Sequence, residues 1–264
     1  MRKYREVARI YFKTQIAFRV DILFQMLFTV SKLLFAYLLW GTIFQEKSLV
    51  AGFTLQGMLS YYLISAFLSQ LDMSASLGEE ISARIRNGTF SNYVVLPVQL
   101  QGYFVAQQVG VMSFYLVFDL LATLVWVVLF GIEFVLTTSI SLIVCALFMA
   151  ILGLFFMIQL NFFLGILTLR FEEISTFLMI KNNLISLING SIVPLVLFPE
   201  TVVKLMKCLP FYYVSYLPAM LFTGRCQEEA SIGLGVLAGW CVVMQVVIAR
   251  TWSVYRKKYE GVGA

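Results

Sequence analysis

The stretch SARIRNGTFSNYVVLPVQL, residues 82–100, contains two arginines, an Asn-Gly pair and a proline between two long apolar segments. The acidic pair Glu79 and Glu80 lies just upstream. Such residues are rare in the segments on either side, which consist mostly of aliphatic and aromatic side chains. A polar, turn-prone insert of this kind is typical of a loop that joins two membrane-spanning helices.

The composition indicates an integral membrane protein. Hydrophobic residues make up 61% of the chain and charged residues 12%, whereas a soluble domain carries about 25% charged residues. The chain has no histidine, which excludes His-based metal sites, His acid–base catalysis and Ser-His-Asp triads. The net charge is +5, and the charged residues cluster at the ends of apolar segments. This placement is explained better by membrane topology than by nucleic-acid binding.

Six segments are long enough to span a membrane, because a spanning helix needs about 20 mostly apolar residues. They are 20–44, 53–73, 103–130, 138–167, 176–198 and 232–254. The fifth is interrupted by Asn182, Asn183, Asn189, Gly190 and Pro194. The predicted fold class is therefore an all-α integral membrane protein. One transmembrane domain covers residues 1–264, with an interfacial helix at 1–19, a cytoplasmic segment at 74–101 and an outer re-entrant region at 199–229.

The basic residues predict the orientation, because cytoplasmic flanks carry an excess of Lys and Arg. One set of flanks holds Arg2, Lys3, Arg5, Arg9, Lys13, Arg19, Arg84, Arg86, Arg170, Lys181, Arg250, Arg256, Lys257 and Lys258. The other set holds only Lys47, Lys204, Lys207 and Arg225. Both termini and the insert at 74–101 are therefore predicted to be cytoplasmic, while the loop near Glu133 and the segment 199–229 face outward.

The N-terminal residues form an amphipathic pattern at the helical period of 100° per residue. Tyr4, Val7, Ile10, Tyr11 and Phe18 gather on one side, and Arg2, Arg5, Arg9 and Lys13 on the other; Phe12 and Ile16 break the pattern. This predicts a helix in the cytoplasmic interface. The alternative is a solvated basic tail.

The region after Asn189 contains four prolines and several short apolar pieces. Non-helical backbone at membrane depth is tolerated where it is buried in protein or lines a cavity. We expect one short helix at 199–207 and another at 211–222, both dipping back from the outer face. A plain outer loop is the alternative. Cys208 and Cys226 fall on this side, and the sequence does not decide whether they form a disulfide.

Two ionisable residues lie inside predicted spans, Lys32 in the first and Asp119 in the third. Such residues are costly in a membrane and usually have a partner. We therefore expect the two side chains to interact, either to brace the bundle or to contact a substrate. Gln159, Asn161, Asn182 and Asn183 are expected to hold helices together.

The chain contains no phosphate-binding loop of the Gly-x-x-x-x-Gly-Lys-[Ser/Thr] type. Any ATP hydrolysis must therefore come from another chain. The insert at 74–101 is the largest inward-facing element between spans. It contains a predicted short helix over 77–86 that ends at Asn87-Gly88, because Asn-Gly favours a left-handed helix stop.

Two motifs and the order of the segments resemble the membrane subunit of type-2 ABC exporters, the ABC-2 permeases, and most of all the branch with drug and viologen exporters. EEISARIRNGTFSNYVVLPVQ, residues 79–99, is similar to that family's glycine followed by a P-[ILV]-[SQ] turn. GSIVPLVLFPETVVKLMKCLPFYYVSYLPAMLFTG, residues 190–224, is similar to its proline-rich stretch before the last span. An amphipathic N-terminal helix followed by six spans completes the resemblance.

The resemblance implies a dimer of such subunits, the same or different, above two ATPase subunits that hold ATP and Mg. This chain would bind no cofactor, would not itself be an enzyme, and would lie in a bacterial plasma membrane. The segment 169–175 would make a smaller ATPase contact. The outer helices would close the exit, with Pro199, Pro210, Phe211 and Pro218 at the gate. The ATPase-coupling residues would be Glu79, Glu80, Ile81, Arg84, Ile85, Arg86, Asn87 and Gly88.

Other classes of function remain as alternatives. An ion- or proton-coupled secondary transporter would use Lys32 and Asp119 as relay residues, although no inverted repeat is visible. A lipid-modifying membrane enzyme is disfavoured because the chain lacks histidine and clustered intramembrane carboxylates. A membrane scaffold without transport activity is the last alternative.

Overall fold

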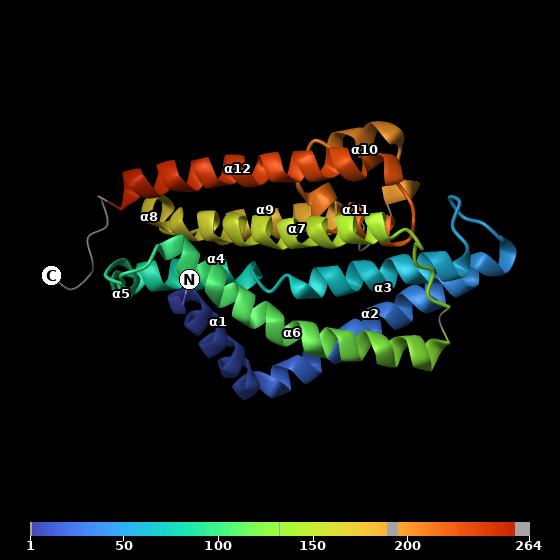
Figure 1. Ribbon diagram of the computed structural model, residues 1–264, viewed down its shortest axis with the longest axis horizontal. Helices are drawn as coiled ribbons and strands as arrows, with labels where there is room; N and C mark the ends of the chain where they lie inside the picture. Colours follow the sequence, from blue (N-terminus) through green and yellow to red (C-terminus); the bar gives the residue numbers. More distant parts are fainter. Residues whose placement is uncertain (1, 132, 189–194, 257–264) are drawn as a thin grey trace.

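The computed structural model describes residues 2–131, 133–188 and 195–256, and Figure 1 shows that this part of the chain is built from helices. Outside the helices, one isolated antiparallel bridge joins Val50 and Phe53 within the described residues. The long helices are α2 (Arg19–Glu46), α3 (Leu55–Leu71), α6 (Leu100–Phe130), α7 (Ile140–Ile166), α9 (Ser175–Ile188) and α12 (Ala230–Tyr255). The shorter ones are α1 (Arg2–Thr14), η1 (Gln15–Phe18), α4 (Ala75–Arg86), α5 (Ser91–Val94), α8 (Thr168–Phe171), η2 (Leu195–Leu197), α10 (Glu200–Met206), η3 (Tyr212–Tyr216), α11 (Leu217–Phe222) and η4 (Gln227–Glu229).

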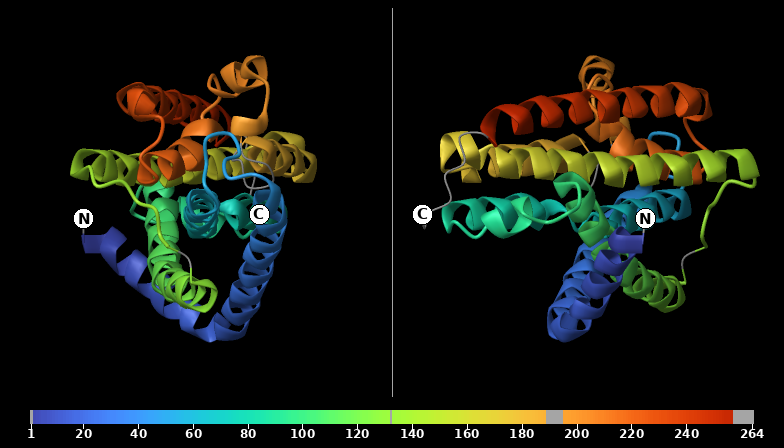
Figure 2. Two further views of the ribbon diagram at one scale, coloured as in Figure 1. Left: turned by 90° about the vertical axis from the view of Figure 1, so that its right-hand side faces the viewer. Right: turned by 60° about the vertical axis from the view of Figure 1, so that its left-hand side comes forward.

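Helix α7 lies in the middle of the bundle, between α12 on one side and α3 on the other (Figure 1). Figures 1 and 2 show that α1 and α2 meet at an angle on the side of the bundle away from α12. The main core contains large apolar side chains from α3, α7, η3 and α12, among them Tyr61, Phe156, Tyr212 and Leu237. The interior is therefore held mainly by aromatic and aliphatic packing around α7.

Three helices in the described residues are long and apolar enough to cross a membrane, namely Leu100–Phe130, Ile140–Phe171 and Gln227–Tyr255. They coincide with the predicted spans 103–130, 138–167 and 232–254. Helix α2 covers the predicted span 20–44, and α3 covers most of 53–73 with 17 residues. Helix α9 has 14 residues, and residues 189–194 of the predicted fifth span lie outside the described residues. The all-helical fold is confirmed, whereas the layout of six crossings stays a prediction.

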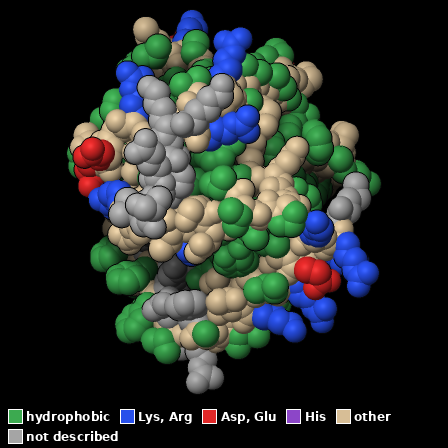
Figure 3. Space-filling model, turned by 90° about the vertical axis from the view of Figure 1, so that its left-hand side faces the viewer, with side chains coloured by type: hydrophobic (Ala, Val, Ile, Leu, Met, Phe, Trp, Pro, Cys, Tyr) green, Lys and Arg blue, Asp and Glu red, His purple; other side chains and the backbone are tan. Residues whose placement is uncertain are grey.

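The elements at the two ends of the bundle differ. One end, called here the α4 end, holds α4, α5, α8, the first turn of α1 and the last turn of α12 (Figure 1). Figure 3 shows this end, where Lys and Arg side chains are more frequent than Asp and Glu. The other end, called the α10 end, holds the loop 47–54, residues 133–139 and the segment 199–229. The elements predicted to face the cytoplasm thus share one end.

Helix α1 forms as predicted, and its position in the membrane interface stays a prediction. It packs on α6 so closely that a Cβ at Gly110 would overlap the carbonyl oxygen of Ala8. Ile10, predicted on the apolar side, is 60% exposed. Phe12, which broke the pattern, has its ring 5.3 Å from that of Phe114. Phe12 thus contacts α6 although it breaks the apolar pattern. The angle at which α1 crosses α6 decides which side chains touch α6, and residue spacing alone does not contain that angle.

Candidate functional site

Helix α4 is held against α7 by a buried face. This face consists of Leu77, Gly78, Ile81, Ser82 and Ile85. The two helices approach so closely that small residues are required at the contact. A Cβ at Gly78 would lie 3.2 Å from the carbonyl oxygen of Asn161, and a Cβ at Gly165 would lie 2.7 Å from Cβ of Ile81. Helix α4 is therefore fixed to the end of α7 with little freedom to slide.

The Asn-Gly pair ends α4 as the sequence predicts. Gly88 has a φ of +72°, a left-handed conformation that glycine adopts at no steric cost. The N–H of Asn87 donates to Ala83 O at 2.9 Å, and the N–H of Phe90 donates to Arg84 O at 3.0 Å. These bonds satisfy carbonyls at the helix end and turn the chain toward α5.

Two charged residues of α4 are engaged within the chain. Arg84 Nη2 lies 2.9 Å from Glu80 Oε1, and Gln107 Nε2 of α6 donates to Glu80 Oε2 at 2.9 Å. The Arg84 guanidinium also stacks over the Tyr93 ring, 4.9 Å from its centroid. Glu80 and Arg84 therefore connect α4 to α5 and α6, and Ile81, Ile85 and Gly88 are buried. Of the eight predicted coupling residues, only Glu79, Arg86 and Asn87 are exposed.

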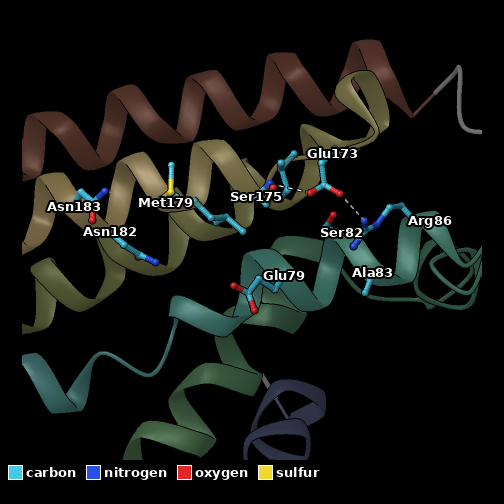
Figure 4. A pocket seen from close by; sticks show the side chains of 11 residues that line it. Glu79, Ser82, Ala83, Arg86, Glu173, Ser175, Met179, Asn182 and Asn183 are labelled. Atoms are coloured by element: carbon cyan, nitrogen blue, oxygen red, sulfur yellow. Dashed lines mark hydrogen bonds and ion pairs between the residues drawn. The ribbon is translucent and has the colours of Figure 1, made fainter.

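A groove of about 550 Å³ lies between α4 and the start of α9. Figure 4 shows Glu79 and Arg86 on its α4 side and Glu173 on the opposite side. Arg86 Nη1 lies 2.8 Å from Glu173 Oε2, so this ion pair bridges the groove. The residues that line it are Glu79, Ser82, Ala83, Arg86, Glu173, Ile174, Ser175, Leu178, Met179, Asn182 and Asn183. The structure thus brings the insert 74–101 and the segment 169–175 together in one surface.

Glu173 is positioned by its own turn. The Ser175 N–H donates to Glu173 Oε1 at 3.0 Å. This bond, together with the Ser175 hydroxyl and the charge of Arg86, lowers the pKa of the Glu173 carboxyl. An exposed ion pair adds little to stability. The pair is therefore better explained as a charged feature that a partner can meet than as a support of the fold.

A buried polar network connects the base of α4 to α7 and α9. Lys181 donates to Asn161 Oδ1 at 2.7 Å, and Asn161 Nδ2 donates to Ser74 Oγ at 2.9 Å. The Ser74 hydroxyl and N–H both donate to Asp72 Oδ1. Asn161 holds helices together as expected. The prediction that Lys181 is a flanking basic residue was wrong, because its side chain is 6% exposed and turned into the bundle.

A second network joins α6, α7 and α12. Gln159 Nε2 donates to Gln245 Oε1 at 3.0 Å, and Gln245 exchanges two hydrogen bonds of 2.8 Å with Gln101. Gln159 therefore holds helices together, as expected of a polar residue inside a span. Asn182 and Asn183 are exposed on α9 instead.

Asp119 is buried on α6, with 6% of the residue exposed. Its Oδ2 has no hydrogen-bond partner among the described residues. The Lys32 side chain lies outside the described residues, so the Lys32–Asp119 interaction stays a prediction.

At the α10 end, Glu229 anchors the two short helices predicted there. Its Oε1 lies 2.7 Å from Lys207 Nζ, and the Tyr212 hydroxyl donates to its Oε2 at 3.0 Å. Nothing in the sequence singles out Glu229, because no motif surrounds it and its partners lie 17 and 22 residues away.

The predicted gate residues occupy different environments in this region. Pro210 and Pro218 are buried, Phe211 is half-buried beside Phe156, and Pro199 is exposed at the start of α10. Cys208 and Cys226 are both free thiols, as are Cys145 and Cys241.

A family model described as ABC-2 family transporter protein matches residues 30–263, which is nearly the whole chain. No curated protein matches the sequence. The match includes α4, the groove and the short helices at the α10 end.

Proposed function

Because the chain belongs to the ABC-2 transporter family, we propose that it is the permease subunit of an ATP-binding cassette exporter. It moves a substrate out of the cytoplasm by alternating access, and separate ATPase subunits drive the cycle. Those subunits bind ATP and Mg, and this chain carries the transport path. The resemblance of two motifs to drug and viologen exporters supports that branch as part of the proposal.

The groove between α4 and the start of α9 is the surface on which the ATPase docks. The single observation that carries this assignment is the position of α4. Its apolar face is buried on α7, while Glu79 and Arg86 line the groove together with Glu173, and Asn87 is exposed next to Arg86 in the chain. An exposed charged face backed by a rigid helix is suited to a soluble partner, since charges at an interface rim steer association and fix its register.

Helix α7 transmits force from this surface to the far end of the bundle. It has 27 residues, which gives a rod of about 40 Å at 1.5 Å per residue. Close to its middle, a Cβ at Gly153 would lie 3.1 Å from Cα of Val214 in η3. A push on α4 therefore reaches η3 and α11 through a helix that is closely packed against both of them.

The membrane unit is a dimer with a second permease subunit, the same or different, so that a path forms between subunits. The α4 end faces the cytoplasm of a bacterial cell, in line with its excess of basic residues. The short helices at the α10 end close the exit on the outer side, with Pro199, Pro210, Phe211 and Pro218 at the gate.

Reversal of an exposed charge tests the docking surface. In Glu79→Lys, co-purification of the ATPase is expected to fall about tenfold or more, because a like-charge contact in an interface costs several kcal/mol. ATP-driven efflux is expected to fall with it. Glu200→Lys, a matched reversal at the α10 end where the side chain is 91% exposed, serves as the control. Unchanged co-purification and efflux in Glu79→Lys contradict the docking surface.

Buried Asp119 supports a second candidate, ion- or proton-coupled secondary transport. A carboxyl with an unpaired oxygen inside a span is a common feature of ion pathways. Transport that persists without ATP and is lost in Asp119→Asn would favour this candidate over the first.

A further inference from the structure

A second cavity, of about 330 Å³, lies deeper in the bundle between α3, α7, α9 and η3. At one side it reaches Asp72 and Ala75 at the base of α4, and at the other it reaches Phe211 and Ser215 of the short helices. It therefore lies between the surface that receives force and the elements that close the exit.

Lys181 brings a positive charge to this cavity. Its side chain is more than nine-tenths buried and has one hydrogen bond among the described residues, to the neutral Asn161 Oδ1. No carboxylate oxygen of the described residues lies within 4.0 Å of its ammonium nitrogen. An ammonium group has three N–H donors, so two remain for a ligand. The Asp72 and Glu79 carboxylates attract this charge from beyond that distance. A buried charge without a direct ion pair is costly, and an anion in the cavity would supply one.

Ser69 adds another unused donor. It lines the same cavity, and its buried Oγ has no hydrogen-bond partner within the described ranges. Asp72 also lines the cavity, but its Oδ1 accepts both the N–H and the hydroxyl of Ser74 and is thereby committed to the junction of α3 and α4. Lys181 and Ser69 can thus both donate hydrogen bonds to a ligand, beside the negative charge that Asp72 brings to the same cavity.

The opposite wall is apolar. Leu154 and Met157 of α7 and Phe211 of η3 line it. The volume lies at the lower end of the range of about 300–1,000 Å³ that is typical of small-molecule sites. The cavity therefore fits a ligand with a compact polar head and a short apolar body.

We propose that this cavity binds an amphipathic molecule with one anionic group, a carboxylate or a phosphate. The anionic oxygens accept hydrogen bonds from Lys181 Nζ and Ser69 Oγ, and the apolar part lies against Leu154, Met157 and Phe211. On the proposed function of an exporter, this is the substrate site. A soluble amphiphile or the headgroup of an anionic lipid supplies the same chemistry.

Binding can be measured on the full chain without any ATPase. The protein is placed in nanodiscs of phosphatidylcholine and titrated calorimetrically with octanoate and with octylamine, and the heat of empty nanodiscs is subtracted. Octanoate is expected to saturate one site and octylamine is not. In Lys181→Met the half-saturating octanoate concentration rises about tenfold or more, because a charged hydrogen bond is lost. Lys181→Arg keeps binding.

A second variant covers the case in which Lys181→Met does not fold. Ala150→Met fills the cavity from α7 and leaves Lys181 in place, and it too is expected to abolish saturable binding.

Nanodiscs that contain phosphatidylglycerol distinguish a lipid headgroup from a soluble amphiphile as the source of the anionic group. Loss of the octanoate signal there assigns the site to a lipid headgroup, and a retained signal assigns it to a soluble amphiphile. Equal octanoate binding by wild type and both variants overturns the proposal. If the ATPase still co-purifies in that case, the proposed function stands without this site.

Discussion

Replacement of Gly165 by alanine tests the close seating of α4 on α7. A Cβ at this position would lie 2.7 Å from Cβ and 2.9 Å from Cγ2 of Ile81, well inside van der Waals contact. Helix α4 must therefore move outward. Overpacking of this kind costs about 1–3 kcal/mol, whereas the higher helix propensity of alanine contributes about 1 kcal/mol in the opposite direction.

Gly235→Ala separates these two effects. Gly235 lies on α12 and an added Cβ there meets no atom within 4 Å, so this variant keeps only the gain in helix propensity. The free energy of unfolding, measured by detergent titration in mixed micelles, is expected to be about 1–3 kcal/mol lower for Gly165→Ala than for Gly235→Ala. ATP-driven efflux is expected to fall in Gly165→Ala alone. Equal stability of the two variants would refute the close contact of α4 and α7.

Three further predictions follow from the polar contacts. Asn161→Leu leaves the Lys181 ammonium and the Ser74 hydroxyl without their shared partner, and is expected to lower the free energy of unfolding by about 3 kcal/mol, whereas Asn183→Leu on the exposed side of α9 changes it by less than about 1 kcal/mol. Glu229→Ala removes a half-exposed ion pair and a tyrosine contact, so we expect a loss of about 1 kcal/mol and faster hydrogen exchange in α10; unchanged exchange would argue against the anchor. The Glu173 carboxyl has a lowered pKa in the folded chain, so its stabilising contribution is present above the ordinary pKa of about 4.3 and is lost as pH falls through the lower folded value. The difference in thermal midpoint between wild type and Glu173→Gln is therefore expected to shrink as the pH falls below ~4.3 and to vanish in strong acid, and a difference that does not shrink would contradict the assignment.

Much of the fold follows from local sequence signals. The Asn87-Gly88 pair ends α4 because it permits a left-handed turn, and the prolines at 199, 210 and 218 divide the segment before α12 into short helices. The long apolar segments predict α6, α7 and α12 because length and hydropathy suffice for a spanning helix.

The interior of the site depends on tertiary geometry and was therefore not predictable in the same way. Lys181 has the sequence context of a flanking basic residue, yet the packing of α9 turns it toward Asn161. Glu80 and Arg84 look like contact residues for a partner, but Gln107 and Tyr93 engage them within the chain. Such contacts join residues that are far apart in the sequence, and neither composition nor periodicity specifies them.

The central claim is that the surface around Glu79 receives the ATPase. A benzophenone attached to Glu79→Cys in a Cys208→Ser background, irradiated in native membranes, is expected to cross-link to an ATPase subunit identified by mass spectrometry. The exposed natural Cys208 at the α10 end, labelled in the otherwise unmodified chain, is expected to give no such product. An ATPase cross-link from Cys208 and none from position 79 would contradict the account.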